Sequence, residues 1–191
     1  MTRSFSDEPL APGLFEECVE LATRAPSAGK TAGWSLVVLT GEETRRYWNV
    51  ALPTDARSTF AFPNLLRAPL VAIACCDPTQ YLARYSEPDK THTGLGSSLD
   101  EWPAPYWTID ASFAVMTLLY ALEDKGVGAL FFAHAREPDL RAEFKIPSEV
   151  QILGVVCAGY ADTSLSRRGR SASRARASVD DVVRRGSYAR S

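Results

Sequence analysis

The residues best suited to ligand binding in this 191-residue chain are concentrated between positions 24 and 34. This segment joins an amphipathic stretch to an apolar one and is rich in Pro, Ser and Gly, which favour an exposed turn. Amides in such a turn are expected to be free to contact something flat and polar, and a serine there can donate and accept a hydrogen bond. The competing interpretation is a plain helix-to-strand turn. The candidate binding residues are Pro26, Ser27, Ala28, Gly29 and Lys30.

Positive charge gathers at the C-terminus. Residues 167–191 carry eight arginines against Asp180 and Asp181, a balance of +6, so the net charge of −2 leaves −8 on residues 1–166. A basic tail on an acidic body calls for an anionic partner, which could be a phosphate group, an acidic patch of another subunit or nucleic acid. The acidic body argues against nucleic acid, because a binding face is normally basic beyond a single tail.

Few side chains could exchange a proton near neutral pH, because the chain has only two histidines, His92 and His134. His134 is the possible catalytic one, although a lone histidine in a loop is more often a surface residue. Trp102, Tyr106 and Trp107 could stack on an aromatic substrate. Their alternative role is ordinary packing in the core or in a dimer.

The four cysteines are expected to be reduced thiols that act as small hydrophobes. No pair of them has the spacing of zinc ligands, so no metal site is expected. No apolar run reaches the roughly 18 residues of a membrane span, and the N-terminus lacks the apolar core of a secretory signal. We therefore expect a cytoplasmic protein without membrane association.

Apolar periodicity places these candidate residues between regular elements. The chain is 46% hydrophobic, enough for one well-buried core. We expect one domain over residues 1–166 and a basic extension over 167–191, in which 179–183 could form a short strand or helical turn on a partner surface. The expected helices span 12–25, 42–50, 55–67 and 137–145, and the expected strands span 34–39, 69–76, 128–132 and 152–160.

A further long helix is expected over residues 110–125, capped by Asp110 and ended by Gly126. Its apolar residues occur on almost every face, so every face must be buried. A small domain can hardly bury such a helix alone, and we predict a subunit interface along it. The alternative is a monomer whose other helices wrap it. Residues 77–109, with four prolines and five Tyr or Trp residues, are expected to form a long irregular loop.

The order of these segments resembles the nitroreductase family of flavin enzymes over nearly the whole chain. Residues 24–34 are similar to the family's Ala-Pro-Ser-x-x-Asn-x-Gln-Pro-Trp segment, although Lys30, Ala32 and Gly33 depart from it. Each similarity is weak singly, but their order and spacing together are specific. The other similar segments are 5–10, 67–71, 110–114, 126–129, 146–147 and 159–160.

Membership in this family implies an α+β fold with a mainly antiparallel central sheet flanked by helices, in an intertwined homodimer. It also implies FMN bound at the dimer interface by residues of both subunits. A hydride would pass from NADH or NADPH through flavin N5 to a nitroaromatic, a quinone or a similar small-molecule acceptor. Relatives with other reactions share the fold, so the fold does not fix the reaction.

The resemblance assigns roles around the flavin ring. The segment from Pro26 to Gly29 matches the one that lines the ring and ribityl chain. Lys30 stands where the family has Asn, and it would either hold the charge of a reduced flavin or point to water. Arg3 matches a basic residue that reaches the flavin O2 edge, unless it is a frayed terminal charge.

Ala133 and His134 occupy the place of a glycine-containing pair whose amides face flavin N5. A side chain does not abolish an amide, but the imidazole of His134 could crowd the ring or face a substrate.

The phosphate of FMN would have to be bound by other residues than the family's usual ones. The family's Arg-Arg-Ser phosphate clamp would lie just before Met1, so the phosphate is expected to bind Arg174 and Arg176, which align with a C-terminal basic pair. The alternative for these two is a solvated tail. Three more arginines have no family counterpart and could replace the clamp: Arg167, Arg168 and Arg170.

Three functions follow from the sequence. The first is an FMN-dependent oxidoreductase that uses NAD(P)H. The second is a non-catalytic relative that binds a flavin or another phosphorylated ligand, and the third is a binder of anionic polymers through the arginine tail. The residues do not distinguish NADH from NADPH and do not identify the acceptor.

Overall fold

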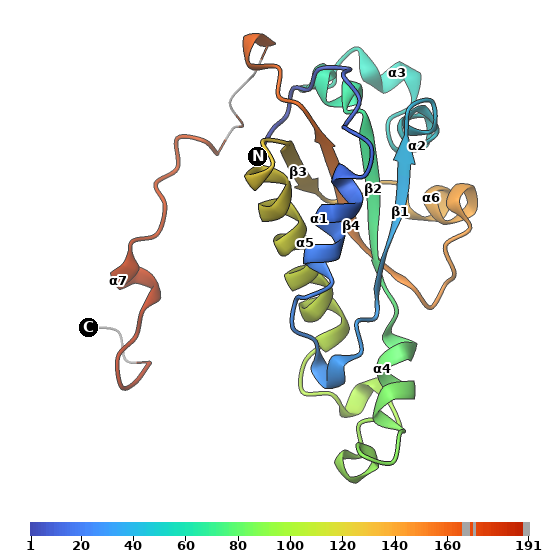
Figure 1. The fold of residues 1–191 in the computed structure, drawn as a ribbon, viewed down its shortest axis with the longest axis vertical. Helices are drawn as coiled ribbons and strands as arrows, with labels where there is room; N and C mark the ends of the chain where they lie inside the picture. Colours follow the sequence, from blue (N-terminus) through green and yellow to red (C-terminus); the bar gives the residue numbers. More distant parts are fainter. Residues whose placement is uncertain (166–168, 170, 189–191) are drawn as a thin grey trace.

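Four strands form one sheet in the order β1-β2-β4-β3 (Figure 1). The computed structural model describes residues 1–165, 169 and 171–188. The strands are β1 (Trp34–Thr40), β2 (Leu70–Cys76), β3 (Gly128–Phe132) and β4 (Gln151–Gly159). All three pairings between them are antiparallel, which confirms the expected α+β architecture.

Helices cover both faces of the sheet (Figure 1). Helices α1 (Leu14–Ala22) and α5 (Tyr106–Asp124) pack on one face. Helices α2 (Glu43–Ala51) and α6 (Glu137–Phe144) pack on the other, with the short α3 (Thr54–Arg57) beside α2. Helix α4 (Pro78–Tyr85) lies beyond one end of the sheet, and α7 (Val179–Val182) lies in the C-terminal tail.

Strand β2 is the centre of the core. All seven of its side chains are buried, as expected for an apolar strand covered on both faces. Because successive side chains of a strand point to opposite faces, they divide between two hydrophobic clusters. Val71, Ile73 and Cys75 join the cluster under α2 and α6, whereas Leu70, Ala72 and Ala74 join the cluster under α1 and α5.

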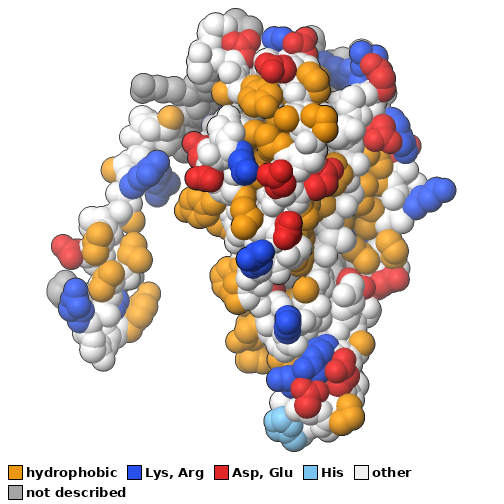
Figure 2. All heavy atoms as spheres, viewed as in Figure 1, with side chains coloured by type: hydrophobic (Ala, Val, Ile, Leu, Met, Phe, Trp, Pro, Cys, Tyr) orange, Lys and Arg blue, Asp and Glu red, His pale blue; other side chains and the backbone are white. Residues whose placement is uncertain are grey.

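Helix α5 is only partly covered within one chain. Leu118 and Leu122 are fully buried against the sheet, whereas Phe113, Met116 and Tyr120 are 48%, 43% and 67% exposed. Figure 2 shows hydrophobic side chains on this outer face of α1 and α5. A subunit interface along α5 would need such an exposed apolar face. The interface itself stays a prediction.

Three expectations differ from the structure. Residues 77–109 are not one irregular loop, because Asp77 caps α4 by accepting the amide of Thr79 at 2.9 Å and Pro78 occupies the first helical turn. The expected helix over 55–67 is interrupted, with a 3-10 turn at Pro63–Arg67 following α3. Helix α5 begins at Tyr106, so Asp110 lies inside the helix and is not its cap.

The chain ends are arranged very differently. The N-terminal segment is bound to the body, because Thr2 donates its amide to Ala129 and Phe5 bridges Ala161. The tail leaves the body, and every described residue from 171 to 188 is exposed (Figure 1). Of the two conformations expected for residues 179–183, a helical turn forms, with a capping box from Ser178.

No helix in the described part of the chain is both long and apolar enough to cross a membrane.

Candidate functional site

The turn that precedes β1 has an unusual backbone. Gly29, Lys30 and Ala32 have φ angles of 61°, 58° and 50°, in the left-handed region. For the two residues with side chains this conformation is unfavourable and persists only where neighbouring groups hold it. The turn is therefore a shaped element and not simply a flexible connection.

Hydrogen bonds to helices α4 and α5 and one bond within the turn hold its shape. The amide of Ala28 donates to Oδ2 of Asp110 on α5 at 2.7 Å. Nε of Arg84 on α4 donates to the carbonyl oxygen of Gly29 at 2.8 Å. The amide of Ala32 donates to Oγ of Ser27 at 3.2 Å.

These bonds correct the expectation that the turn's amides are free. The amides of Ala28 and Ala32 bind side chains, and those of Lys30 and Thr31 donate to carbonyls within the turn. Among the residues that the structure describes, the amide of Gly29 has no acceptor. The turn thus offers a ligand the Gly29 amide, the hydroxyl hydrogen of Ser27 and the exposed ammonium of Lys30.

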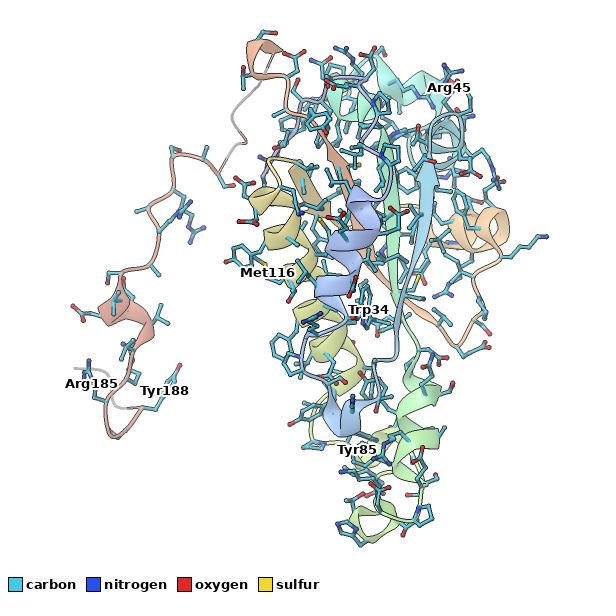
Figure 3. The ribbon with its side chains drawn as sticks, in the orientation of Figure 1. Trp34, Arg45, Tyr85, Met116, Arg185 and Tyr188 are labelled. Atoms are coloured by element: carbon cyan, nitrogen blue, oxygen red, sulfur yellow. The ribbon has the colours of Figure 1, made fainter. Side chains whose placement is uncertain are left out.

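The predicted substrate aromatics lie beside this turn. Trp102 is only 8% exposed, and its indole Nε1 donates to the carbonyl of Leu95 at 2.9 Å. Its ring packs against Tyr85, with centroids 4.6 Å apart, and against Tyr106 at 5.7 Å. Trp102 therefore belongs to the aromatic core of this end of the molecule, where Figure 3 labels Tyr85. Tyr106 and Trp107 are half-buried, and their stacking on a substrate stays a prediction.

A second group of predicted residues lines a cavity on the α2 face of the sheet. Its volume is about 430 Å³, and both Arg3 and Ala133 line it. The rest of its wall is mainly hydrocarbon, so the guanidinium of Arg3 is the only formal side-chain charge among the described lining residues. The aromatic lining residues are Tyr47, Trp48, Phe60, Phe62, Phe131 and Phe132.

Arg3 is held in place at this cavity. Its guanidinium carbon lies 5.6 Å from the centre of the Phe62 ring, within the range of a cation–π interaction. On another side it meets Gly169, where a Cβ atom would lie 3.2 Å from Cζ of Arg3. The residue is half-buried and has no acidic partner within the described parts of the chain. It is therefore not a frayed terminal charge.

His134 follows β3, and the cavity is lined by its neighbours Ala133 and Ala135 but not by His134 itself. Its Nε2 lies 3.0 Å from Oε2 of Glu137, and its side chain is 20% exposed. Hydrogen bonds from His134 and from Arg141 hold the pKa of Glu137 below its usual value. The imidazole packs on α6, which does not favour it as a proton donor to a molecule in the cavity.

The backbone amides at His134 and Ala135, unlike the His134 side chain, could bind a ligand. Between residues 1 and 165, the amides of His134 and Ala135 have no hydrogen-bond acceptor. Ala135 lines the cavity, and the binding of a ligand there by these two amides stays a prediction.

The basic tail provides the remaining candidates. Arg174 and Arg176 are exposed and have no acidic partner in the described ranges. Arg174 follows Gly169 by five residues, so its Cα can lie no more than about 18 Å from the residue that touches Arg3. Arg167, Arg168 and Arg170 lie outside the described residues.

The structure does not bring all predicted residues together within one chain. The turn with Ser27 lies near α4 at one end, whereas Arg3 and the start of β3 lie at the other (Figure 1). Sequence analysis missed Asp110 as a partner of the turn, although a carboxylate inside an apolar helix was the available signal. It also missed the aromatic wall formed by Phe60 and Phe62.

The nitroreductase family profile matches residues 1–160. The chain belongs to the nitroreductase family. It is 27% identical over 176 residues to a Thermus thermophilus protein named NADH dehydrogenase, covering 83% of this chain and 80% of that protein.

Solved structures of the nitroreductase family share the fold. A nitroreductase family protein from Streptococcus pneumoniae superposes with a TM-score of 0.70 at 20% identity, covering 96% of this chain and 94% of that one. A nitroreductase-like protein from Streptococcus mutans gives 0.70 at 15% identity, with 92% of each chain covered.

Proposed function

We propose that this nitroreductase-family protein is an FMN-dependent oxidoreductase that passes a hydride from NADH or NADPH to a nitroaromatic, a quinone or a similar acceptor. Family membership and the name of the Thermus thermophilus relative support an oxidoreductase. The observation that carries the proposal is Arg3, a half-buried cation at the rim of an aromatic cavity, with no acidic partner among the residues that the structure describes.

The residues of the cavity suit a flavin ring. Its aromatic walls match a flat, largely apolar ligand, and the amides of His134 and Ala135 supply hydrogen-bond donors at its rim. FMN, when bound, supplies the atom that accepts a hydride and later gives it up. Arg3 would stabilise the negative charge that reduction places on the pyrimidine edge, and the protein would otherwise contribute orientation and exclusion of water.

The phosphate of FMN would be bound by the tail. Arg174 and Arg176 are exposed cations within chain reach of Gly169, which contacts Arg3. An arginine fork is well suited to a phosphate, because it can donate two parallel hydrogen bonds.

We propose that the active form is a homodimer. Met116 lies on the uncovered outer side of α5 (Figure 3), and its neighbours Phe113 and Tyr120 are exposed as well. A monomer would leave this apolar face in water. In a dimer, the turn that carries Ser27 and the cavity that carries Arg3 could come from different subunits and form one site.

The tail adds a second contact to this proposed dimer. Strand β1 is an edge strand, and a groove of about 460 Å³ runs between it and α1. The tail carries the exposed apolar residues Val179, Val182 and Val183, which do not pack on their own body. We place the tail of each subunit in the groove of the other. The apolar side chains that line the groove are Phe15, Val19, Trp34, Leu36 and Val38.

The purified full-length protein decides between the enzyme and the non-catalytic alternative. A yellow protein, or one that takes up FMN and bleaches with NADH or NADPH without oxygen, supports the oxidoreductase. Tight FMN binding without reduction by either nucleotide would favour the flavin-binding protein without catalysis. A colourless protein that neither takes up FMN nor oxidises either nucleotide would rule out the proposed function.

A further inference from the structure

Asp110 is a buried carboxylate in the otherwise apolar helix α5. Asp110 is 5% exposed, and most of its neighbours along the helix are apolar. A buried charge is costly unless hydrogen bonds satisfy it, so its partners indicate why it is present.

Both hydrogen-bond donors to this carboxylate come from other elements. The amide of Ala28 in the turn donates at 2.7 Å, and the hydroxyl of Tyr81 on α4 donates at 2.9 Å to the same oxygen. Tyr81 is 1% exposed, so this cluster is shielded from water. Asp110 therefore joins the turn, α4 and α5 at one point.

Arg84 binds the same turn as a hydrogen-bond donor, whereas Asp110 binds it as an acceptor. Its Nε donates to the carbonyl of Gly29 at 2.8 Å, one residue after the amide that Asp110 binds. The guanidinium is itself fixed by Asp89 at 2.8 Å and by Glu87 at 3.0 Å. The turn is thus held by two side chains, with Asp110 accepting from one of its amides and Arg84 donating to one of its carbonyls.

Close packing restricts the turn further. A Cβ at Gly29 would lie 2.9 Å from Cε2 of Tyr85, and one at Gly33 would lie 2.8 Å from Cε2 of Tyr81. Helix α4 therefore lies so near that larger residues do not fit. The left-handed conformations of Lys30 and Ala32 are maintained between these contacts.

We propose that Asp110 is a positioning residue for the ligand site, which holds the turn so that the Ser27 hydroxyl and the Gly29 amide stay open to the bound ligand. Tyr81 and Arg84 assist it. The identity of the ligand as FMN rests on the proposed function, whereas the holding of the turn does not. A purely structural Asp110 would stabilise the fold without altering a bound flavin.

The test compares Asp110→Asn and Tyr81→Phe with the wild-type protein. Asparagine keeps the size of the side chain and one acceptor oxygen but removes the negative charge that strengthens both hydrogen bonds, and phenylalanine removes only the hydroxyl. Thr44→Val is the matched control, because it also removes a buried hydroxyl, one that donates to the carbonyl of Gly41, and Thr44 lies on α2 outside both the turn and the cavity lining. Thermal melting identifies any variant that fails to fold. If Asp110→Asn does not fold, Tyr81→Phe still tests the proposal.

The first measurement is amide hydrogen exchange of residues 27–33 in FMN-free protein. We expect Asp110→Asn to accelerate exchange there by about 10-fold or more, Tyr81→Phe to do so by a smaller factor, and Thr44→Val to leave it unchanged. Unchanged exchange in both test variants would overturn the holding role, whether or not the protein binds FMN.

The second measurement is the affinity for FMN and the reduction potential of the bound flavin. We expect Asp110→Asn to weaken FMN binding by about 10- to 100-fold and to shift the potential, because donors near the flavin are displaced. A loosened turn with unchanged affinity and potential would overturn the positioning role and leave Asp110 a structural residue. A wild-type protein that takes up no FMN would contradict the proposed function, while the exchange result would still decide the holding of the turn.

Discussion

The guanidinium of Arg3 lies over the ring of Phe62, with Cζ 5.6 Å from the ring centre. This contact joins the N-terminal segment to the chain that follows α3 and places a cation at the rim of an aromatic cavity. Because no acidic side chain within the described residues neutralises it, Arg3 is available to an anionic or electron-rich ligand. Several experiments can test the consequences.

Replacing Arg3 should weaken FMN binding more than it destabilises the fold. Arg3→Gln keeps a polar side chain but removes the charge, and we expect the dissociation constant for FMN to rise about 10-fold or more. Arg24→Gln is the matched control, since Arg24 is an exposed arginine of the same body that pairs with Glu20. Equal affinity of the Arg3 variant and wild type in a fluorescence titration would remove Arg3 from the site.

The hydrogen bonds of Glu137 predict a small pH-dependent stabilisation. His134, followed by Arg141, lowers the pKa of the folded carboxylate below its usual value. A lowered folded pKa stabilises the protein above the unfolded pKa, and this stabilisation is lost as the pH falls through the folded pKa. The Glu137 side chain is 44% exposed, so screening limits the effect to a few tenths of a kcal/mol.

Urea unfolding of Glu137→Gln at several pH values measures this effect. We expect a lower free energy of unfolding than wild type at neutral pH, with the difference disappearing as the pH falls below the usual pKa of a glutamate and through the lowered pKa of the folded state. Glu101→Gln, an exposed residue at the other end of the molecule, should show no such trend. A difference that persists unchanged at a pH well below the usual pKa of a glutamate would contradict the assignment.

The cysteines should be unreactive in the native protein. All four are free and buried, and burial raises the pKa values of Cys75 and Cys76 to about 11. At pH 8 only about one in a thousand such thiols is ionised, so alkylation should be at least 100-fold slower than for an ordinary cysteine. Four thiols should react in denaturant. One fast thiol in the folded protein would show that a cysteine is exposed.

The sheet could be predicted from sequence because its signals are local. The apolar run of β2 and the glycine after α5 mark their elements without help from distant residues. The expected strands agree with the structure to within a residue or two, and helix α5 to within a few residues at its start. Helix α4 was missed because the prolines around it suggest a loop, while its stability depends on the Asp77 cap and on the packing of Tyr81.

The candidate site could be predicted only in part, because its contacts join distant positions. The bond between Asp110 and Ala28 spans 82 residues, and nothing in either local sequence indicates the other. His134 illustrates the same limit, since its position after β3 was foreseen but its attachment to Glu137 on α6 was not. The pairing of Arg3 with Phe62 likewise depends on how the sheet brings two segments together.

Substitutions on the two sides of α5 should have different effects. Leu118 is fully buried beneath the helix, so Leu118→Ala should lower the free energy of unfolding by about 2–5 kcal/mol. Phe113, which is 48% exposed on the outer side, should contribute to association instead. Phe113→Asp should therefore shift the protein toward monomer in analytical ultracentrifugation. A Phe113→Asp protein that still forms dimers at low concentration would contradict the interface along α5.

The tail offers the sharpest test of the proposed subunit exchange. Val182 is 70% exposed and Val183 is 44% exposed within one chain, so substituting them should not affect the folding of the body. If the tail lies in the groove beside β1 of a second copy, a double Val182→Asp and Val183→Asp variant would bury two charges in an apolar groove.

We expect this double variant to dissociate at protein concentrations where wild type remains dimeric, and to lose bound FMN with it. Ser173→Asp together with Ser187→Asp provides the control, because it adds the same charge to exposed tail positions outside the helical turn. The melting temperature of residues 1–165 should be similar in the two double variants when both are compared as monomers or both as dimers. A dimer as stable as wild type after the valine substitutions would show that the tail does not hold the subunits together, and the groove beside β1 would need another occupant.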